Sequence, residues 1–240
     1  MIISHKYKFI FIKPTKVGGT SVEVALAKHC GNKDIITPVT KYNPNSDEDK
    51  YIQPVKNYKD KGFFNHISPE EIKKKIGNRT WNNYYKFTVV RNPWDQTISR
   101  YWWKKAIRKQ VIIKKVILNL FNPKAYKFVI SRICNKKNKT NNFNDFINIF
   151  DKKWTNTLYY FDKKGNPICD FYIMYENLDK DYEKVCNHLG IPYEKLPKTK
   201  NKQRKDKKHY SEYYNKDTRK KVYNLFKKEI DFFNYKFESK

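Results

Sequence analysis

Short apolar runs alternate with glycine-containing turns and helical patterns in the first part of the chain. Residues 8–13 (KFIFIK) form a compact apolar run, which predicts a buried strand. A turn rich in proline and glycine follows at residues 13–19. Residues 20–30 have helical spacing, and Gly31 is a typical C-terminal stop. The order predicted for this segment is therefore strand, glycine turn and helix.

The same order returns later in the chain. Residues 68–71 (SPEE) have the pattern of a capping box with proline at the first helical position, which predicts a helix to about Ile76. Residues 85–90 (YKFTVV) predict a second buried strand, and residues 93–108 predict a helix with an apolar and aromatic face. Helices that alternate with apolar strands indicate an α/β fold with a largely parallel sheet.

The remaining segments have weaker patterns. Residues 34–61 are polar with little periodicity, and we interpret them as a long variable excursion. Residues 107–133 are apolar and basic, and the Asn122-Pro123 pair is expected to divide them into two helices. Five further elements are predicted: helices at 143–150, 179–189 and 215–233, and strands at 157–161 and 168–175. Gly190 is the expected stop of the helix at 179–189.

Composition is compatible with one large domain and argues against a disordered chain. The chain has 240 residues, of which 39% are hydrophobic and 17% aromatic, so it contains enough apolar mass for a core. We therefore predict a single domain over residues 1–240, with variable segments at about 34–61 and 107–156. The four cysteines stand far apart without metal-ligand spacing, so reduced thiols in a cytosolic compartment are expected.

The net charge is strongly positive. The chain has 52 Lys and Arg against 24 Asp and Glu, a formal charge of +28. An anionic ligand or surface would explain this charge. Codon bias would also explain it, because only seven of the basic residues are arginine and Lys, Asn, Ile, Tyr and Phe are all abundant. Nucleic-acid binding is therefore not inferred from charge alone. No apolar stretch is long enough to predict a transmembrane span, and no signal peptide is apparent.

The first glycine turn is a candidate anion site. Lys16 is followed by Gly18 and Gly19, at the point where a strand delivers the chain to the start of a helix. Free backbone N–H groups and the helix dipole favour an anion there, and Thr20 and Ser21 add hydroxyl donors. In the P-loop of nucleotide triphosphatases the lysine follows the glycines, whereas here it precedes them, which favours an anion site without metal. A plain tight turn with a helix cap remains the alternative.

A second candidate site follows the second strand. Arg91 stands at the end of this strand, and Ser99 is expected two turns inside the next helix. Arginine binds phosphate through two parallel hydrogen bonds, and a serine hydroxyl can add a third. The alternative is that Arg91 pairs with Asp95 and that Ser99 is a small packing residue.

Together the two motifs resemble the sulfotransferases that use 3′-phosphoadenosine 5′-phosphosulfate (PAPS). Members of that family open with a strand and a PKTGGTS-like loop and later have FxFVRNPWDRxVSxY; this sequence has PTKVGGTS and FTVVRNPWDQTISRY. Further similarity lies in NHISPEEI, in DFYIMYENLDKDYEKVCNHLGI and in the closing DFFNYKF. The likeness runs from about Phe9 to Phe237, with a weak stretch at residues 109–156. It is greatest to the carbohydrate branch that includes the heparan sulfate 2-O-sulfotransferases.

The resemblance implies roles for particular residues. His66 corresponds to the general base of this branch, and Arg91 and Ser99 to the ligands of the 3′-phosphate. One departure is Val17, which replaces the usual threonine and removes a hydroxyl donor. Arg204 or Lys207, in the lysine-rich loop 198–209, would lie where relatives close over the nucleotide. The 5′-phosphosulfate loop would consist of Lys16, Val17, Gly18, Gly19, Thr20 and Ser21.

The resemblance also implies a fold and a reaction. The fold would be a three-layer sandwich around a mostly parallel sheet, the P-loop-like fold of sulfotransferases. The reaction would be in-line transfer of a sulfuryl group from PAPS to an acceptor hydroxyl, that of a carbohydrate, with His66 as base and Lys16 stabilising the leaving phosphate, and without a metal. A cytoplasmic enzyme of bacterial or viral type is expected. The alternatives are a phosphotransferase similar to nucleotide kinases and a basic nucleic-acid-binding protein; an inactive member of the family that only binds glycan also stays open.

Overall fold

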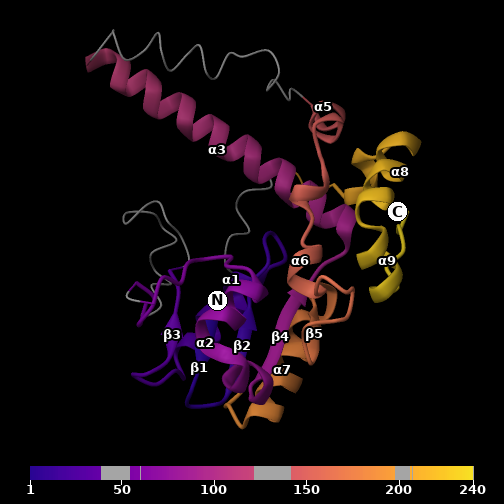
Figure 1. Cartoon of the computed structure of the whole chain (residues 1–240). Helices are drawn as coiled ribbons and strands as arrows, with labels where there is room; N and C mark the ends of the chain where they lie inside the picture. Colours follow the sequence, from indigo (N-terminus) through magenta and orange to yellow (C-terminus); the bar gives the residue numbers. More distant parts are fainter. Residues whose placement is uncertain (39–54, 60, 122–141, 198–205, 207, 240) are drawn as a thin grey trace. The chain divides into compact units, whose positions relative to one another are not determined.

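A computed structural model describes residues 1–38, 55–59, 61–121, 142–197, 206 and 208–239 and, of residues 109–121, only the backbone (Figure 1). The chain divides into two compact units. Unit 1 consists of Met1–Asn92 with Asn156–Asn201, and unit 2 of Pro93–Thr155 with Lys202–Lys240. Each unit has a hydrophobic core of its own. Whether the chain acts as a single domain stays a prediction.

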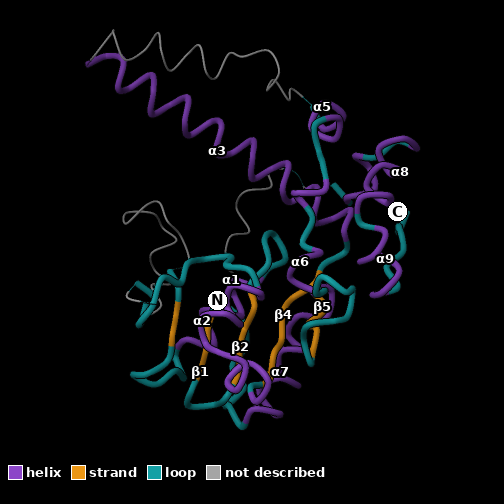
Figure 2. The backbone as a smooth tube through the Cα atoms, in the orientation of Figure 1, coloured by secondary structure: helices purple, strands orange, loops and turns teal. Residues whose placement is uncertain are grey.

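Unit 1 is built around a five-stranded sheet with helices packed against it (Figures 1 and 2). The strand order is β3-β1-β2-β4-β5. β2 pairs in parallel with β4, and β4 with β5, whereas β1 pairs antiparallel with both β2 and β3. The α/β class is confirmed, but the largely parallel sheet of the prediction is a mixed sheet. The strands are β1 (Ile2–Ser4), β2 (Phe9–Ile12), β3 (Ile35–Ile36), β4 (Tyr85–Val90) and β5 (Phe171–Met174).

The antiparallel half of the sheet was not predicted because its strands are very short. β1 has three residues and β3 has two, too few to show a period of their own. Asp34 fixes the turn between β1 and β2: its carboxylate accepts hydrogen bonds from Ser4 Oγ at 2.7 Å and from the backbone N–H of His5 at 2.7 Å. Hydrogen bonds to the charged form lower the pKa of Asp34 despite its partial burial.

Two helices of unit 1 cover one face of the sheet. α1 (Gly19–Ala27) contributes Val22 and Leu26, and α7 (Leu178–Leu189) contributes Tyr182 and Val185, to a core that includes Phe87 of β4. The predicted glycine stop of α7 is confirmed, because Gly190 has the left-handed conformation typical of that position. The three-layer arrangement stays a prediction.

The predicted capping box starts α2 (Pro69–Asn83) and is confirmed in both directions: Ser68 Oγ accepts from the N–H of Glu71, and the Glu71 carboxylate accepts from the N–H of Ser68. The helix extends beyond the predicted end at Ile76. Gly77, with φ of 79°, interrupts the helical backbone there and allows a second stretch to continue.

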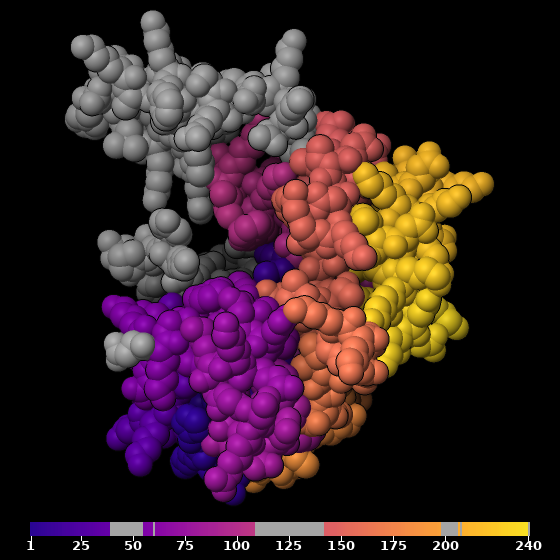
Figure 3. Space-filling model, viewed as in Figure 1, coloured from indigo at the N-terminus to yellow at the C-terminus, as the bar shows by residue number. Residues whose placement is uncertain are grey.

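Residues 157–161 were predicted as a strand, and this prediction is wrong. Residues Thr157–Tyr160 form the short helix α6, with Asn156 as its N-cap residue. The predicted strand at 168–175 is confirmed as β5, with narrower limits. In the space-filling view the surface of the segment from α6 to β5 adjoins that of α2 (Figure 3). Lys163, between α6 and β5, forms a 2.7 Å ion pair with Glu70 of α2.

Unit 2 contains helices that pack around aromatic side chains. α3 (Pro93–Phe121) is longer than predicted and contributes Trp94, Ile98 and Tyr101 to the core. The predicted terminal helix is divided near Phe226 into two helices. The predicted break at Asn122-Pro123 lies outside the described residues, as does most of the 34–61 excursion. The other elements of unit 2 are α5 (Phe143–Asn148), η3 (Lys152–Trp154), η5 (Tyr210–Tyr213), α8 (Lys216–Leu225) and α9 (Lys227–Phe233).

Candidate active site

The parallel half of the sheet brings three separate segments to one edge. Because β2, β4 and β5 run in the same direction, their carboxyl ends lie side by side. β2 leads into the glycine loop, β4 leads into Arg91, and β5 leads into Tyr175. Ligands of open α/β sheets bind at this edge.

The glycine loop between β2 and α1 has an unusual backbone. Lys16 has φ of 64°, a left-handed conformation that is uncommon for residues other than glycine. Gly18 has φ of 85° and is the N-cap of α1, so no side chain occupies the start of this helix. A Cβ at Gly18 would lie 2.7 Å from the ring of Tyr175. Only glycine fits at this position, and no side chain caps the start of α1, a kind of helix end that favours an anion.

Val17 has no part in the polar surface of the loop. Its side chain is fully buried in the core of unit 1. The side chain at this position therefore belongs to the core, and a role of the Val17 backbone N–H toward an anion stays a prediction. Ser21 is also mostly buried, and Thr20 is half-buried.

Arg91 lies against both the glycine loop and Tyr175. Its Nη1 donates a hydrogen bond of 3.4 Å to the carbonyl oxygen of Lys16. Its guanidinium carbon lies 4.0 Å from the centre of the Tyr175 ring, a close cation–π contact. The segments that follow β4 and β5 are also joined, because the N–H of Asn92 donates to the carboxylate of Glu176 at 2.8 Å. The structure thus brings together Arg91 and the loop that contains Lys16, two of the predicted site segments.

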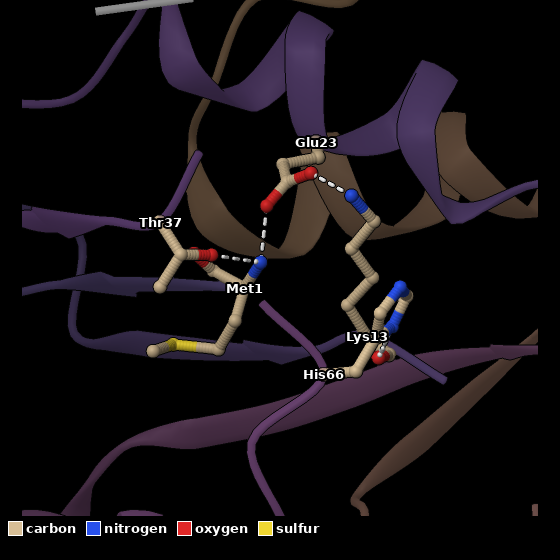
Figure 4. A network of polar contacts seen from close by, with 5 residues as sticks. All are labelled: Met1, Lys13, Glu23, Thr37 and His66. Atoms are coloured by element: carbon tan, nitrogen blue, oxygen red, sulfur yellow. Dashed lines mark hydrogen bonds and ion pairs between the residues drawn. The ribbon is translucent and has the colours of Figure 1, made fainter. Parts of the chain in front are cut away.

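A buried ion pair fixes both ends of the glycine loop (Figure 4). Lys13, at the end of β2, pairs with Glu23 of α1, and both side chains are buried. The amino group of Met1 contacts the same carboxylate and donates to Thr37 Oγ1 at 3.0 Å. Burial alone would raise the pKa of Glu23, but the charge of Lys13 and the contact with the Met1 amino group lower it to about 2. Strand end and helix are therefore held by a charged pair beneath the loop.

His66 is attached to the same strand end. Its Nδ1 lies 2.8 Å from the carbonyl oxygen of Lys13, and its own carbonyl oxygen accepts a 2.7 Å hydrogen bond from the hydroxyl of Tyr159. A carbonyl oxygen can only accept, so Nδ1 carries the proton and Nε2 presents a lone pair. His66 has φ of 61° and stands just before the cap of α2. The ring is held in one tautomer.

The environment of His66 keeps the ring neutral. Burial lowers its pKa, the positive charge of Lys13 lowers it further, and the value is about 4 rather than the ordinary 6.5. At neutral pH the ring can accept a proton at Nε2.

The structure does not test every predicted residue. Ser99 lies in α3 of unit 2 and is half-buried, and its role toward a phosphate stays a prediction. Arg204 and Lys207 lie outside the described residues. Over the described ranges, no group of three or more His, Cys, Asp or Glu residues is placed to hold a metal ion. No helix in the same ranges is long and apolar enough to cross a bilayer.

Three residues of the site had no role in the sequence analysis. Tyr175 carries a usable signal, because it follows a strand as directly as Arg91 does. Asn156 and Tyr159 had none, because their segment looks like a strand. They contact the glycine loop and His66 from more than 90 positions away in the chain.

Comparisons with known proteins place the chain in a family. The chain is 29% identical over 123 residues to a protein of Archaeoglobus fulgidus whose name assigns no function, covering 51% of this chain and 82% of that protein. No solved structure matches the chain. Residues 1–236 match the Sulfotransferase family, a match that includes the glycine loop, His66, Arg91 and Ser99. The chain therefore belongs to the Sulfotransferase family.

Proposed function

We propose that this protein is a PAPS-dependent sulfotransferase that sulfates a hydroxyl group of a carbohydrate, as in the branch that includes the heparan sulfate 2-O-sulfotransferases. The observation that best supports the proposal is the 3.4 Å contact from Arg91 to the carbonyl oxygen of Lys16. Two anion-binding motifs that are 75 positions apart meet at one edge of the sheet, as a nucleotide with phosphates at both ends of its ribose requires.

The residues present fit such a donor. The open start of α1, the missing side chain at Gly18 and the charge of Lys16 suit the 5′-phosphosulfate. Arg91 suits the 3′-phosphate, to which Ser99 would add a hydroxyl group. Bound PAPS would supply the sulfuryl group.

Two groups of the chain would act in the transfer. Lys16 and the loop N–H groups would stabilise the charge that develops on the departing phosphate. Nε2 of His66 would accept the proton of the acceptor hydroxyl, while Nδ1 keeps its proton for the Lys13 carbonyl. A pKa of about 4 makes His66 a weak base. Negative charge of a bound donor nearby would raise this pKa toward neutrality.

The distribution of charge supports an acidic acceptor. No Asp or Glu occurs between Asp95 and Asp145, whereas thirteen Lys and Arg do. Codon bias toward A and T adds lysine but does not remove Asp and Glu, whose codons also tolerate A and T. Codon bias alone therefore does not explain why this basic segment has no acidic residues, whereas binding of a polyanionic glycan would explain it.

Two measurements test the proposed function. In a thermal-shift assay, 3′-phosphoadenosine 5′-phosphate (PAP) should stabilise the protein more than AMP does. With PAPS as donor, mass spectrometry should detect an 80 Da gain on acidic glycans more than on neutral ones, since sulfation adds SO₃. Absence of both effects would contradict the proposal. Transfer from ATP with Mg²⁺ would favour the phosphotransferase alternative.

A further inference from the structure

Asn156, the N-cap residue of α6, binds the glycine loop through its side chain. Asn156 is fully buried, and its side-chain amide forms three hydrogen bonds with Thr15. Its Oδ1 accepts from the N–H of Thr15 at 3.2 Å and from the Thr15 hydroxyl at 3.0 Å, and its Nδ2 donates to the Thr15 carbonyl at 2.8 Å. The pairing of β2 with β4 ends at Ile12. Beyond that residue, the Asn156 amide takes the place of a neighbouring strand by bonding the backbone N–H and carbonyl of Thr15. Thr15 directly precedes Lys16, whose left-handed backbone is thereby held.

The single turn of α6 contacts the His66 segment. Tyr159 is 8% exposed, and its hydroxyl donates to the carbonyl oxygen of His66 at 2.7 Å. The His66 ring is held from the other side by the carbonyl of Lys13. The peptide and the ring of this left-handed residue are therefore both fixed, one by α6 and one by the glycine loop.

We propose that α6 is a brace that sets the position of the glycine loop relative to His66, with Asn156 and Tyr159 as positioning residues. This inference rests on the proposed function, in which the loop holds the donor and His66 accepts the proton. Reacting groups must be held in near-attack geometry, and a displacement of about 1 Å can reduce turnover about 100-fold. The brace contacts both partners from one rigid turn of four residues, Thr157–Tyr160, and its cap.

The chain offers a matched control on the same helix. Tyr160 is 1% exposed, and its hydroxyl donates to the carbonyl of Val89 at 3.3 Å. Tyr159→Phe and Tyr160→Phe each remove one buried hydroxyl that bonds a backbone carbonyl. A structural role alone predicts similar effects of the two substitutions, whereas a positioning role predicts different ones.

The first experiment compares these two variants in the full chain. Tyr159→Phe should lower kcat about 10-fold or more, at unchanged affinity for PAP, and should shift the His66 ring resonances and their pH titration. Tyr160→Phe should leave kcat and the His66 titration unchanged at a similar loss in Tm. Equal kcat values and equal His66 titrations in the two variants would overturn the role of Tyr159.

The second experiment examines the other end of the brace. Asn156→Ala should weaken PAP binding about 10-fold or more in calorimetry, because it removes three contacts to Thr15. Asn215→Ala removes an N-cap side chain of α8 in unit 2 and should leave PAP binding unchanged. If Asn156→Ala does not fold, Thr15→Val removes only the hydroxyl contact and should weaken PAP binding to a smaller extent. Unchanged PAP affinity in the folded variants would overturn the role of Asn156.

The two proposals fail in different ways. If the unsubstituted protein neither binds PAP nor transfers sulfate, the proposed function is wrong. The His66 titration still reports on the brace in that case, because it needs neither donor nor acceptor. If the unsubstituted protein is active and the matched variants behave alike, the brace alone is wrong.

Discussion

The ring nitrogen Nδ1 of His66 lies 2.8 Å from the backbone carbonyl oxygen of Lys13, the residue that follows β2. This one contact joins the segment before α2 to the strand that leads into the glycine loop. It selects the tautomer of the imidazole, and the ammonium group of the same lysine helps to keep the ring neutral. Lys13 therefore acts on His66 through both its backbone and its charge.

His66→Asn tests the base and its titration together. Asparagine tolerates the left-handed backbone and can still donate to Lys13, but it does not titrate. We expect kcat to fall about 100-fold or more. Stability should change with pH as well. The folded pKa of His66, about 4, lies below the unfolded value of 6.5, so its contribution is complete above pH 6.5 and is lost as the pH falls toward 4.

Urea unfolding at several pH values between 7 and 4 measures this effect. The loss of stability on acidification should be smaller in His66→Asn than in the unsubstituted protein. Parallel curves for the two proteins would show that His66 titrates normally.

Lys16 can be compared with Lys8, because the two lysines flank β2 and both have a left-handed backbone, with φ of 64° and 52°. Lys16→Ala should lower kcat about 100- to 1000-fold through loss of charge stabilisation at the leaving phosphate. Lys8→Ala removes the same kind of side chain from a residue with a similar backbone conformation, but it should keep full turnover. A similar fall in both variants, measured as product formed from PAPS, would show that stability rather than charge is responsible.

Gly18 and Gly77 form another matched pair, with φ of 85° and 79°. An alanine at either position should cost about 1–3 kcal/mol in unfolding free energy, because both residues have a positive φ that L side chains rarely adopt. At Gly77 nothing lies within 4 Å of the added Cβ, whereas at Gly18 the ring of Tyr175 lies at 2.7 Å. Calorimetry should therefore find weaker PAP binding in Gly18→Ala only. Normal PAP binding in that variant would place the nucleotide elsewhere.

Arg91 should determine which nucleotide is preferred. Arg91→Ala should lower the affinity for PAP about 10- to 100-fold and change that for AMP little, because only PAP has a 3′-phosphate. Arg219→Ala removes a comparable stacked arginine, 4.3 Å from the Phe237 ring in unit 2, and should leave the ratio of the two affinities unchanged. Equal losses for PAP and AMP in Arg91→Ala would argue against a 3′-phosphate contact.

The ion pair of Lys13 and Glu23 should show strong coupling in unfolding experiments. Lys13→Met or Glu23→Gln alone leaves a buried charge with fewer partners and should cost about 3–5 kcal/mol. The double variant should lose much less than the sum of the two single losses. Additive losses, measured by urea unfolding, would mean that the two side chains do not stabilise each other.

The sequence was sufficient where local signals dominate. The capping box at Ser68, the strand over residues 85–90 and the stop at Gly190 all depend on neighbouring residues. The contact between Arg91 and the loop was inferable because two strand-turn-helix units of a parallel sheet end at one edge.

The features that the sequence did not predict depend on contacts between segments that are distant along the chain. Residues 157–161 are apolar and aromatic, which favours a strand, but the hydrogen bonds of Asn156 to Thr15 and of Tyr159 to His66 accompany a helix there. The low pKa of His66 depends on burial and on the charge of Lys13, which is 53 positions away. Neither effect has a signature in the local pattern.

The fit of Gly18 against the ring of Tyr175 has a consequence for biosynthesis. The loop emerges from the ribosome before the surface that shapes it, which is translated more than 150 residues later. A nascent chain that stops before β5 contains the whole loop motif and yet lacks the strand whose end completes it. The capacity to hold a nucleotide should thus appear late in translation, when the final parallel strand has joined the sheet.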